Sequence, residues 1–299
     1  MIYEYAVDPS LFTAEDKACF ILESFGRDNG RLVSEIKKDH WVNLVRAAIR
    51  TSDNKTVAKH TLKEALKILT KNNRALYCRQ QQVEEGDWLS MTQQAHSGWP
   101  YRGILLEEYN GDEPQYLVRD IHLGGKENWK APSSLTIDRE AAAMVTAVSA
   151  LLENAREVVL VDRNFRLENQ NGNPVSKYKN VLLGIAWCLA NKQYGPKVGK
   201  LVYHIGDQYY TVANLQTQFT NYLSADLPAG FRLEFAIWPK NDLHDRFILT
   251  DIGGIDCGIG LDEYAGSSER TVKLKRLSNA DHSSEWSRFK QKIVDVVLP

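Results

Sequence analysis

Residues 244–260 read His-Asp-Arg-Phe-Ile-Leu-Thr-Asp-Ile-Gly-Gly-Ile-Asp-Cys-Gly-Ile-Gly and form the most informative stretch of the chain. The run from 244 to 250 predicts a β-strand. Because side chains alternate along a strand, His244 and Arg246 are expected to share one face. A histidine can act as a nucleophile or as a general acid or base, and an arginine offers a planar fork of donors to phosphoryl oxygens. The two residues together predict a site for a phosphate group.

Three later residues of the same stretch belong to this predicted site. Asp251 follows at the end of the strand, where a carboxylate can orient an imidazole or pair with a basic group. Gly258 and Gly260 lack side chains, so their backbone can approach a ligand closely. We therefore expect a catalytic group of His244, Arg246 and Asp251, with Gly258 and Gly260 helping Arg246 to bind phosphate.

The surrounding sequence alternates between strand and helix patterns. Strands are predicted at 157–162, 200–205, 231–238, 244–250 and 254–260, and helices at 137–154, 174–192, 210–223 and 283–297. This alternation is typical of an α/β sheet with helices on its faces. The last two strands have no helix between them, which indicates a mixed, partly antiparallel region.

The first part of the chain is expected to be mainly helical, with one β-hairpin. Helices are predicted from the N-cap Thr13, over 32–49 and over 57–76. Two strands, 101–109 and 115–123, flank Asn-Gly-Asp at 110–112, which is a strong turn signal. The polar loop at 124–134 predicts a boundary. We thus expect an α/β protein with domains at 1–134 and 135–299.

The spacing within 244–258 resembles the signature of the phospholipase D superfamily. That signature has His-x-Lys, four residues, Asp, six residues and Gly, and its places are filled here by His244, Arg246, Asp251 and Gly258. Arginine replaces the lysine, Ile259 stands where serine is common, and Leu261 stands where asparagine is common. The order of predicted elements from residue 157 also resembles one half of that fold, so the resemblance covers about 140 residues.

This resemblance implies a phosphodiesterase, most often a nuclease, that works without a metal or cofactor. His244 would attack the phosphodiester to form a phosphohistidine, and Arg246 would hold the phosphate. The family's enzymes use two such motifs. Because the sequence holds one, the resemblance implies a homodimer in which two copies of His244 face each other. A role in bacterial antiviral defence is associated with proteins of this build.

A second interpretation stays open beside the enzyme. The run from His244 to Asp262 also resembles the phospholipase-D-like domain at the C-terminus of MIT-domain proteins, which is regarded as non-catalytic. The chain would then bind a phosphate-bearing lipid, a nucleic acid or a partner protein. Arg246 and the single motif favour this binding module, whereas the presence of both His244 and Asp251 favours the enzyme. If the chain is the enzyme, its first part would recognise a substrate or partner.

Basic residues near the motif are weaker candidates for nucleic-acid contacts. Arg163 ends the predicted strand at 157–162. A basic run follows the motif, consisting of Arg270, Lys273, Lys275 and Arg276. Such a run can grip a phosphate backbone, and its alternative interpretation is a solvated basic turn.

Composition limits the remaining possibilities. The 299 residues carry a net charge of -1, so no whole-chain field attracts nucleic acid or anionic lipid. No apolar run is long enough for a membrane span, and the first residues lack a signal-peptide pattern. The four cysteines lie far apart and fit neither a disulfide framework nor a zinc site. We expect a cytoplasmic protein, and we expect it to bind no metal.

Overall fold

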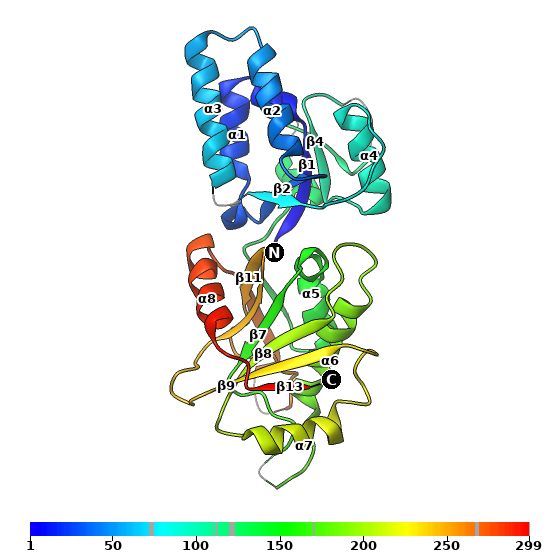
Figure 1. Ribbon diagram of the computed structural model, residues 1–299, viewed down its shortest axis with the longest axis vertical. Coiled ribbons are helices and arrows are strands. Elements are labelled where there is room, and N and C mark those ends of the chain that lie inside the picture. The colour runs from blue at the N-terminus through cyan, green and yellow to red at the C-terminus, as the bar shows by residue number, and fades with distance from the viewer. Residues whose placement is uncertain are drawn as a thin grey trace. The chain divides into compact units, whose positions relative to one another are not determined.

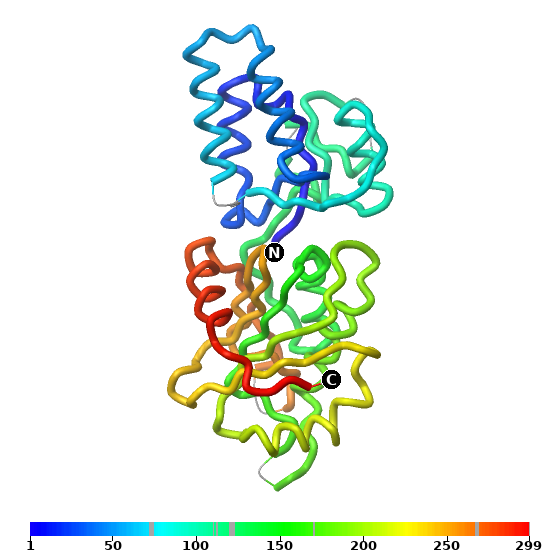
Figure 2. The backbone as a smooth tube through the Cα atoms, in the orientation of Figure 1, coloured from blue at the N-terminus to red at the C-terminus, as the bar shows by residue number. Residues whose placement is uncertain are grey.

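The computed structural model describes residues 1–71, 75–109, 111, 113–119, 123–169, 171–266 and 269–298. The chain divides into two compact units, one of Ile2–Pro132 and one of Met1 with Ser133–Pro299. Each unit is a β-sheet flanked by helices (Figures 1 and 2), so the predicted α/β class is confirmed. The division falls two residues before the predicted boundary at 134/135.

The unit Ile2–Pro132 holds a five-stranded sheet in the order β3-β2-β1-β4-β5, with every neighbouring pair parallel. Its strands are β1 (Tyr3–Val7), β2 (Arg31–Glu35), β3 (Leu76–Cys78), β4 (Gly103–Leu106) and β5 (Tyr116–Val118). Its helices are α1 (Glu15–Ser24), α2 (His40–Thr51), α3 (Thr56–Thr70) and α4 (Trp88–Gly98).

Helices cover both faces of this sheet (Figure 1). Tyr5 and Val7 of β1 pack with apolar residues of α1, α2 and α3, whereas Ala6 packs with residues of α4. A parallel sheet needs this double cover because its strands are apolar on both sides.

The predicted β-hairpin is wrong, and the prediction of a mainly helical region did not include the five-stranded parallel sheet. β4 and β5 are parallel, with Leu105 paired to Leu117. The Asn-Gly-Asp turn signal lies within a nine-residue connection, which is long enough for the chain to return and start a parallel strand; residues 110 and 112 are outside the described residues. The single helix predicted at 32–49 is also wrong, because this range contains most of strand β2 and of helix α2. Leu32 and Ile36 continue the helical spacing of the apolar residues of α2, which are Val42, Val45 and Ile49.

The second unit holds an eight-stranded mixed sheet in the order β13-β9-β8-β7-β10-β11-β12-β6. Its strands are β6 (Ser134–Asp138), β7 (Val158–Asp162), β8 (Lys200–Gly206), β9 (Arg232–Trp238), β10 (Arg246–Thr250), β11 (Gly253–Asp256), β12 (Thr271–Arg276) and β13 (Val296–Leu298). Its helices are α5 (Ala141–Asn154), α6 (Ser176–Ala190), α7 (Val212–Tyr222) and α8 (Asn279–Gln291).

β7, β8 and β9 are parallel, and the other neighbouring pairs of this sheet are antiparallel. The mixed region that the sequence predicted is therefore present. β6, β12 and β13 were not predicted, and the residues of β6 and β13 had been assigned partly to the neighbouring helices.

The two faces of the sheet bury different residues. On one face, Val159 and Val161 of β7 pack with Phe247 of β10 and Phe289 of α8. On the other face, Tyr203 of β8 contacts the ring of Phe165, which also contacts Tyr178 of α6. We call these the α8 face and the α6 face (Figure 1).

Candidate functional site

The carboxyl ends of β7, β8 and β9 lie at one edge of the sheet because the three strands are parallel, and antiparallel β10 begins at the same edge. Open α/β sheets bind ligands just outside this edge. Asp162 ends β7 and Arg246 begins β10, and the two are paired across the strands on the α6 face. Together with Arg163, His244 and Gly260 they form what we call the β7–β10 site.

Asp162 is the buried centre of this site. Its side chain has no exposed surface, and its two carboxyl oxygens accept hydrogen bonds from the backbone N–H groups of Asn164 (2.8 Å) and Leu261 (2.9 Å). Burial raises the pKa of Asp162 to about 6 despite these two hydrogen bonds and the nearby Arg246. Asp162 therefore ties the end of β7 to the glycine-containing loop after β11.

Arg246 lies above this carboxyl group and is partly exposed. Its Nε is 3.9 Å from Oδ1 of Asp162, and its Nη1 donates to the backbone oxygen of Gly258 at 3.3 Å. A guanidinium has five N–H donors, so these contacts hold Arg246 in place while leaving donors for a ligand oxygen.

The two glycines shape the loop, and their amides are used within the protein. The N–H of Gly258 donates to Asp256, and the N–H of Gly260 donates to the backbone oxygen of Cys257. Gly260 has φ +144°, and a Cβ at this position would lie 2.9 Å from Oδ1 of Asp262 and 3.3 Å from Oδ2 of Asp162. The prediction that these glycines offer backbone to phosphate is therefore wrong for their N–H groups. Gly260 serves instead to let two buried carboxyl groups and Arg246 come close together.

Asp262 forms a second buried centre that sequence reasoning missed. It is 2% exposed, and its carboxylate pairs with Arg139 and with Lys177, whose Nζ lies 2.5 Å from Oδ2. Arg139 also donates from Nε to the backbone oxygen of Asp262. Charged residues are seldom this buried unless they are paired. The run Gly-Leu-Asp at 260–262 was the only signal in the sequence for this centre.

His244 is exposed in the loop before β10 and contacts Arg163. Nη1 of Arg163 lies 2.8 Å from Nδ1 of His244. A guanidinium can only donate, so this contact assigns an acceptor role to Nδ1 and places the proton of neutral His244 on Nε2. The sequence expected His244 beside Arg246. It did not predict that Arg163, a weak candidate, would be the residue that contacts the imidazole.

Neighbouring elements hold the backbone segments that carry these two side chains. Arg288 of α8 donates to Oδ2 of Asp245 (2.9 Å) and to the backbone oxygen of Asp242 (2.7 Å), which fixes the loop carrying His244. The backbone oxygen of Arg163 accepts from Gln208, and Gly206 allows the close approach, since a Cβ there would lie 2.9 Å from that oxygen.

Asp251 lies away from the site. Its Oδ1 accepts from the backbone N–H groups of Arg156 (2.8 Å) and Glu157 (3.2 Å), just before β7 begins. The full length of β7 separates this position from Arg163 and His244. The expectation that Asp251 reaches His244 or Arg246 is wrong because Asp251 closes the opposite end of β10.

The basic run is a strand, and it does not extend the site. In β12, Lys273 and Lys275 are exposed, and the register through Asp256 and Phe247 places Lys275 on the α8 face, away from Arg246. Arg276 donates to the backbone oxygen of Met1 at 2.8 Å. Arg270 is exposed just before the strand. The interpretation of this run as a turn is therefore wrong, because these residues follow the period of a strand.

His204 of β8 also lies on the α8 face, where it is part of the packed core. Its side chain has no exposed surface, and its Nδ1 accepts from Nε1 of Trp238 at 2.8 Å. Burial, with Lys292 and Arg288 nearby, lowers the pKa of His204 to about 3. The imidazole is therefore neutral and packed against Phe289.

The surface near the α6 face contains a small hollow of about 320 Å³ lined by Arg166, Glu168, Asn169, Asn171 and Tyr209. Arg166 donates to the hydroxyl of Tyr209 at 3.0 Å. Neither His244 nor Arg246 lines this hollow. Among the described residues, no group of three His, Cys, Asp or Glu side chains could hold a metal ion.

Comparisons with known proteins add little. No known protein family matches the chain. No curated protein matches it either. A solved structure of TrmBL2, an archaeal chromatin protein that shows a novel mode of DNA binding, matches with a TM-score of 0.27 and 8% identity, over 55% of this chain and 52% of that one. The chain thus spans about half the length of that protein. This likeness is too low to bear on the fold or the function. Within the described residues, no helix is both long and apolar enough to cross a membrane.

Proposed function

We propose that the chain binds a phosphate-bearing group at the β7–β10 site through Arg163, His244 and Arg246, and that it does not cleave that group. The contact between Arg163 and Nδ1 of His244 carries this proposal. With Nδ1 as the acceptor, Nε2 bears the proton, so the imidazole can donate a hydrogen bond to a phosphoryl oxygen. A nucleophilic imidazole needs the opposite arrangement, with Nδ1–H held by an acceptor and a free lone pair on Nε2.

The charges around His244 support the same conclusion. Two guanidinium groups, of Arg163 and Arg246, lie at one edge of the sheet, and the carboxyl group of Asp162 is fully buried beneath them. In the part of the chain that the structure describes, no carboxylate is hydrogen-bonded to His244. Fixed guanidinium groups beside a donor imidazole suit the binding of a phosphate dianion or diester.

Ring-nitrogen NMR of His244 tests the proposal directly. We expect a proton on Nε2 and none on Nδ1 in the neutral imidazole, with the resonance assigned by its loss in His244→Gln. Binding is measured by phosphorus NMR with dimethyl phosphate as the probe. Arg246→Ala should weaken binding about 10- to 100-fold, which corresponds to the loss of a charge-assisted hydrogen bond.

Lys273→Ala is the matched control, because it removes one exposed cation from the opposite face of the sheet. It should leave the affinity for dimethyl phosphate unchanged. Turnover of bis(p-nitrophenyl) phosphate in excess EDTA that disappears in His244→Ala would overturn the proposal and restore the phosphodiesterase interpretation, with its homodimer and nucleic-acid substrate.

A further inference from the structure

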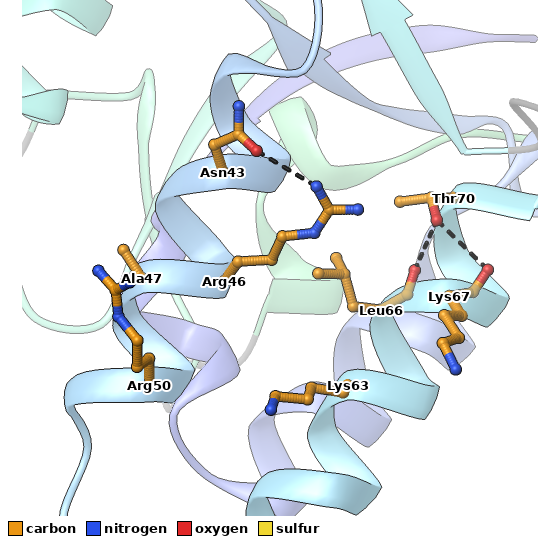
Figure 3. A pocket seen from close by; sticks show the side chains of 8 residues that line it. All are labelled: Asn43, Arg46, Ala47, Arg50, Lys63, Leu66, Lys67 and Thr70. Atoms are coloured by element: carbon orange, nitrogen blue, oxygen red, sulfur yellow. Dashed lines mark hydrogen bonds between the residues drawn. The ribbon is translucent and has the colours of Figure 1, made fainter.

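A basic hollow lies between α2 and α3 in the unit Ile2–Pro132, and neither the motif nor the proposed function uses it. The hollow has a volume of about 520 Å³, and its wall is formed by Asn43, Arg46, Ala47, Arg50, Lys63, Leu66, Lys67 and Thr70 (Figure 3). Four of these eight residues are cationic, and none is acidic or aromatic. The volume lies in the range of binding sites for small ligands or short ligand segments.

The cations form one row on each helix that lines the hollow, and Arg46 and Lys63 extend into the space between the helices (Figure 3). Arg46 and Arg50 are one turn apart on α2, and Lys63 and Lys67 are one turn apart on α3. Lys59 extends the second row, and its Nζ donates to the backbone oxygen of Arg50. The row on α3 therefore spans about 12 Å at 1.5 Å per residue.

This arrangement is unfavourable for the protein alone. Like charges four residues apart destabilise a helix, and three such pairs occur here. Lys67 has an ion pair with Glu64 at 2.6 Å, and Arg46 donates to the amide oxygen of Asn43 at 3.2 Å. The whole chain has a net charge of -1, so the excess of positive charge is local. An anion with several charges would relieve this repulsion.

We infer that the hollow binds the sugar-phosphate backbone of a nucleic acid through its phosphates alone. The floor is formed by the aliphatic Leu66 and Ala47, so the wall offers neither a ring for stacking nor an acceptor-rich pocket for a base. Two rows of cations along a hollow suit a chain of successive phosphates better than a single phosphate group. Recognition of this kind is independent of sequence and sensitive to salt.

The test measures binding of a short labelled oligothymidylate to the full chain by fluorescence anisotropy at several salt concentrations. The variant Arg46→Gln with Lys63→Gln removes one cation from each row. Each cation on a single strand contributes about 0.7 to the slope of log K against log salt, so the slope should become shallower by about 1.4. At low salt the affinity should fall at least about tenfold. The charge-conserving variant Arg46→Lys with Lys63→Arg should retain binding.

Lys37→Gln with Lys38→Gln is the matched control, since it removes two exposed cations from the same unit outside the hollow. If this control and the hollow variant change the slope equally, the inference is wrong. It is also wrong if the hollow variant loses binding to phosphatidylserine vesicles but keeps its affinity for the oligothymidylate. The difference in affinity for the oligothymidylate between wild type and hollow variant should persist when both also carry Arg246→Ala. The test of the hollow therefore does not depend on the β7–β10 site.

Discussion

Asp162 makes the stability of the fold depend on pH. Its carboxyl group has no exposed surface and loses its proton only near pH 6. Its pKa is raised from 3.8 to about 6 in the folded chain. A raised pKa in the folded state means that the unfolded state releases this proton first. The contribution of Asp162 to the free energy of unfolding is therefore fully present below pH 4 and is lost as the pH rises through about 6.

Asp162→Asn should remove this dependence. As the pH rises from 4 to 7, the free energy of unfolding of the variant should increase relative to that of wild type by on the order of 3 kcal/mol. This is the free energy that corresponds to a shift of about two pKa units. Urea unfolding of both proteins at several pH values measures the difference. A difference that stays constant with pH would show that Asp162 does not ionise in this range.

Gly260 offers a test of the crowding between the two buried carboxyl groups. Gly260→Ala places a Cβ 2.9 Å from Oδ1 of Asp262, and that carboxylate is held by Arg139 and Lys177. We expect a loss of about 2 kcal/mol in the free energy of unfolding, the range for a strained backbone or a forced shift at a packed site.

Gly26→Ala separates the two causes of that loss. Gly26 also has a large positive φ, of +120°, but a Cβ there would meet nothing within 4 Å. The substitution at Gly260 should therefore cost more than the one at Gly26, as measured by thermal unfolding. Equal losses would mean that backbone conformation alone requires glycine at both places.

At the scale of elements, helix α8 supports the loop that carries His244. Arg288→Ala removes the hydrogen bonds to Asp245 and to the backbone of Asp242. Because Arg288 is 36% exposed, we expect less than about 1 kcal/mol of lost stability. Hydrogen exchange of the backbone amides at 240–245 should nevertheless become faster, and dimethyl phosphate should bind more weakly.

The control for this prediction is Lys290→Ala, on the same helix. Lys290 pairs with Glu157 instead of with the loop before β10. Its substitution should leave the exchange of the backbone amides at 240–245 unchanged. If both variants loosen the loop equally, the support comes from the position of the helix and not from Arg288.

The sequence predicted elements best where burial and periodicity agree. β7, with five buried residues and a Val-Val-Leu-Val core, and helix α6 were both predicted within about two residues. Prediction failed where pairing depends on distant residues. Nothing in the sequence near residue 110 distinguishes a hairpin from a parallel return, because sheet register is set by the partner strand. β12 alternates buried and exposed residues and could have been found from its period of two.

The same distinction applies to the candidate site. His244 and Arg246 were predicted from a local pattern, and the pairing of Arg246 with Asp162 depends on two strands 84 residues apart. Asp251 was placed wrongly because spacing along one strand does not tell which end faces the ligand edge. Arg163 meets His244 only through the fold. The basic hollow, by contrast, could have been recognised from cations spaced four residues apart on two predicted helices.

At the scale of the whole molecule, His204 predicts how the chain responds to acid. Its pKa is lowered from 6.5 to about 3 because the ring is buried near Lys292 and Arg288. A lowered pKa in the folded state means that the unfolded chain takes up the proton first as the pH falls. The stability that His204 contributes is therefore present above pH 6.5 and is lost progressively toward pH 3. This sign is opposite to that of Asp162, so the two groups partly offset each other between pH 4 and pH 6.

His204→Gln isolates this effect, since an amide can accept from Trp238 without titrating. The variant should be less stable than wild type at pH 8, because it loses ring packing against Phe289. As the pH falls from 8 to 5, the difference in the free energy of unfolding between wild type and variant should narrow by about 2 kcal/mol. At pH 5 the histidine of the unfolded wild-type chain is one and a half units below its pKa, and its protonation stabilises the unfolded state by this amount. Urea unfolding followed by far-ultraviolet circular dichroism measures both values. A constant gap for His204→Gln would mean that the buried imidazole takes up its proton without unfolding the chain.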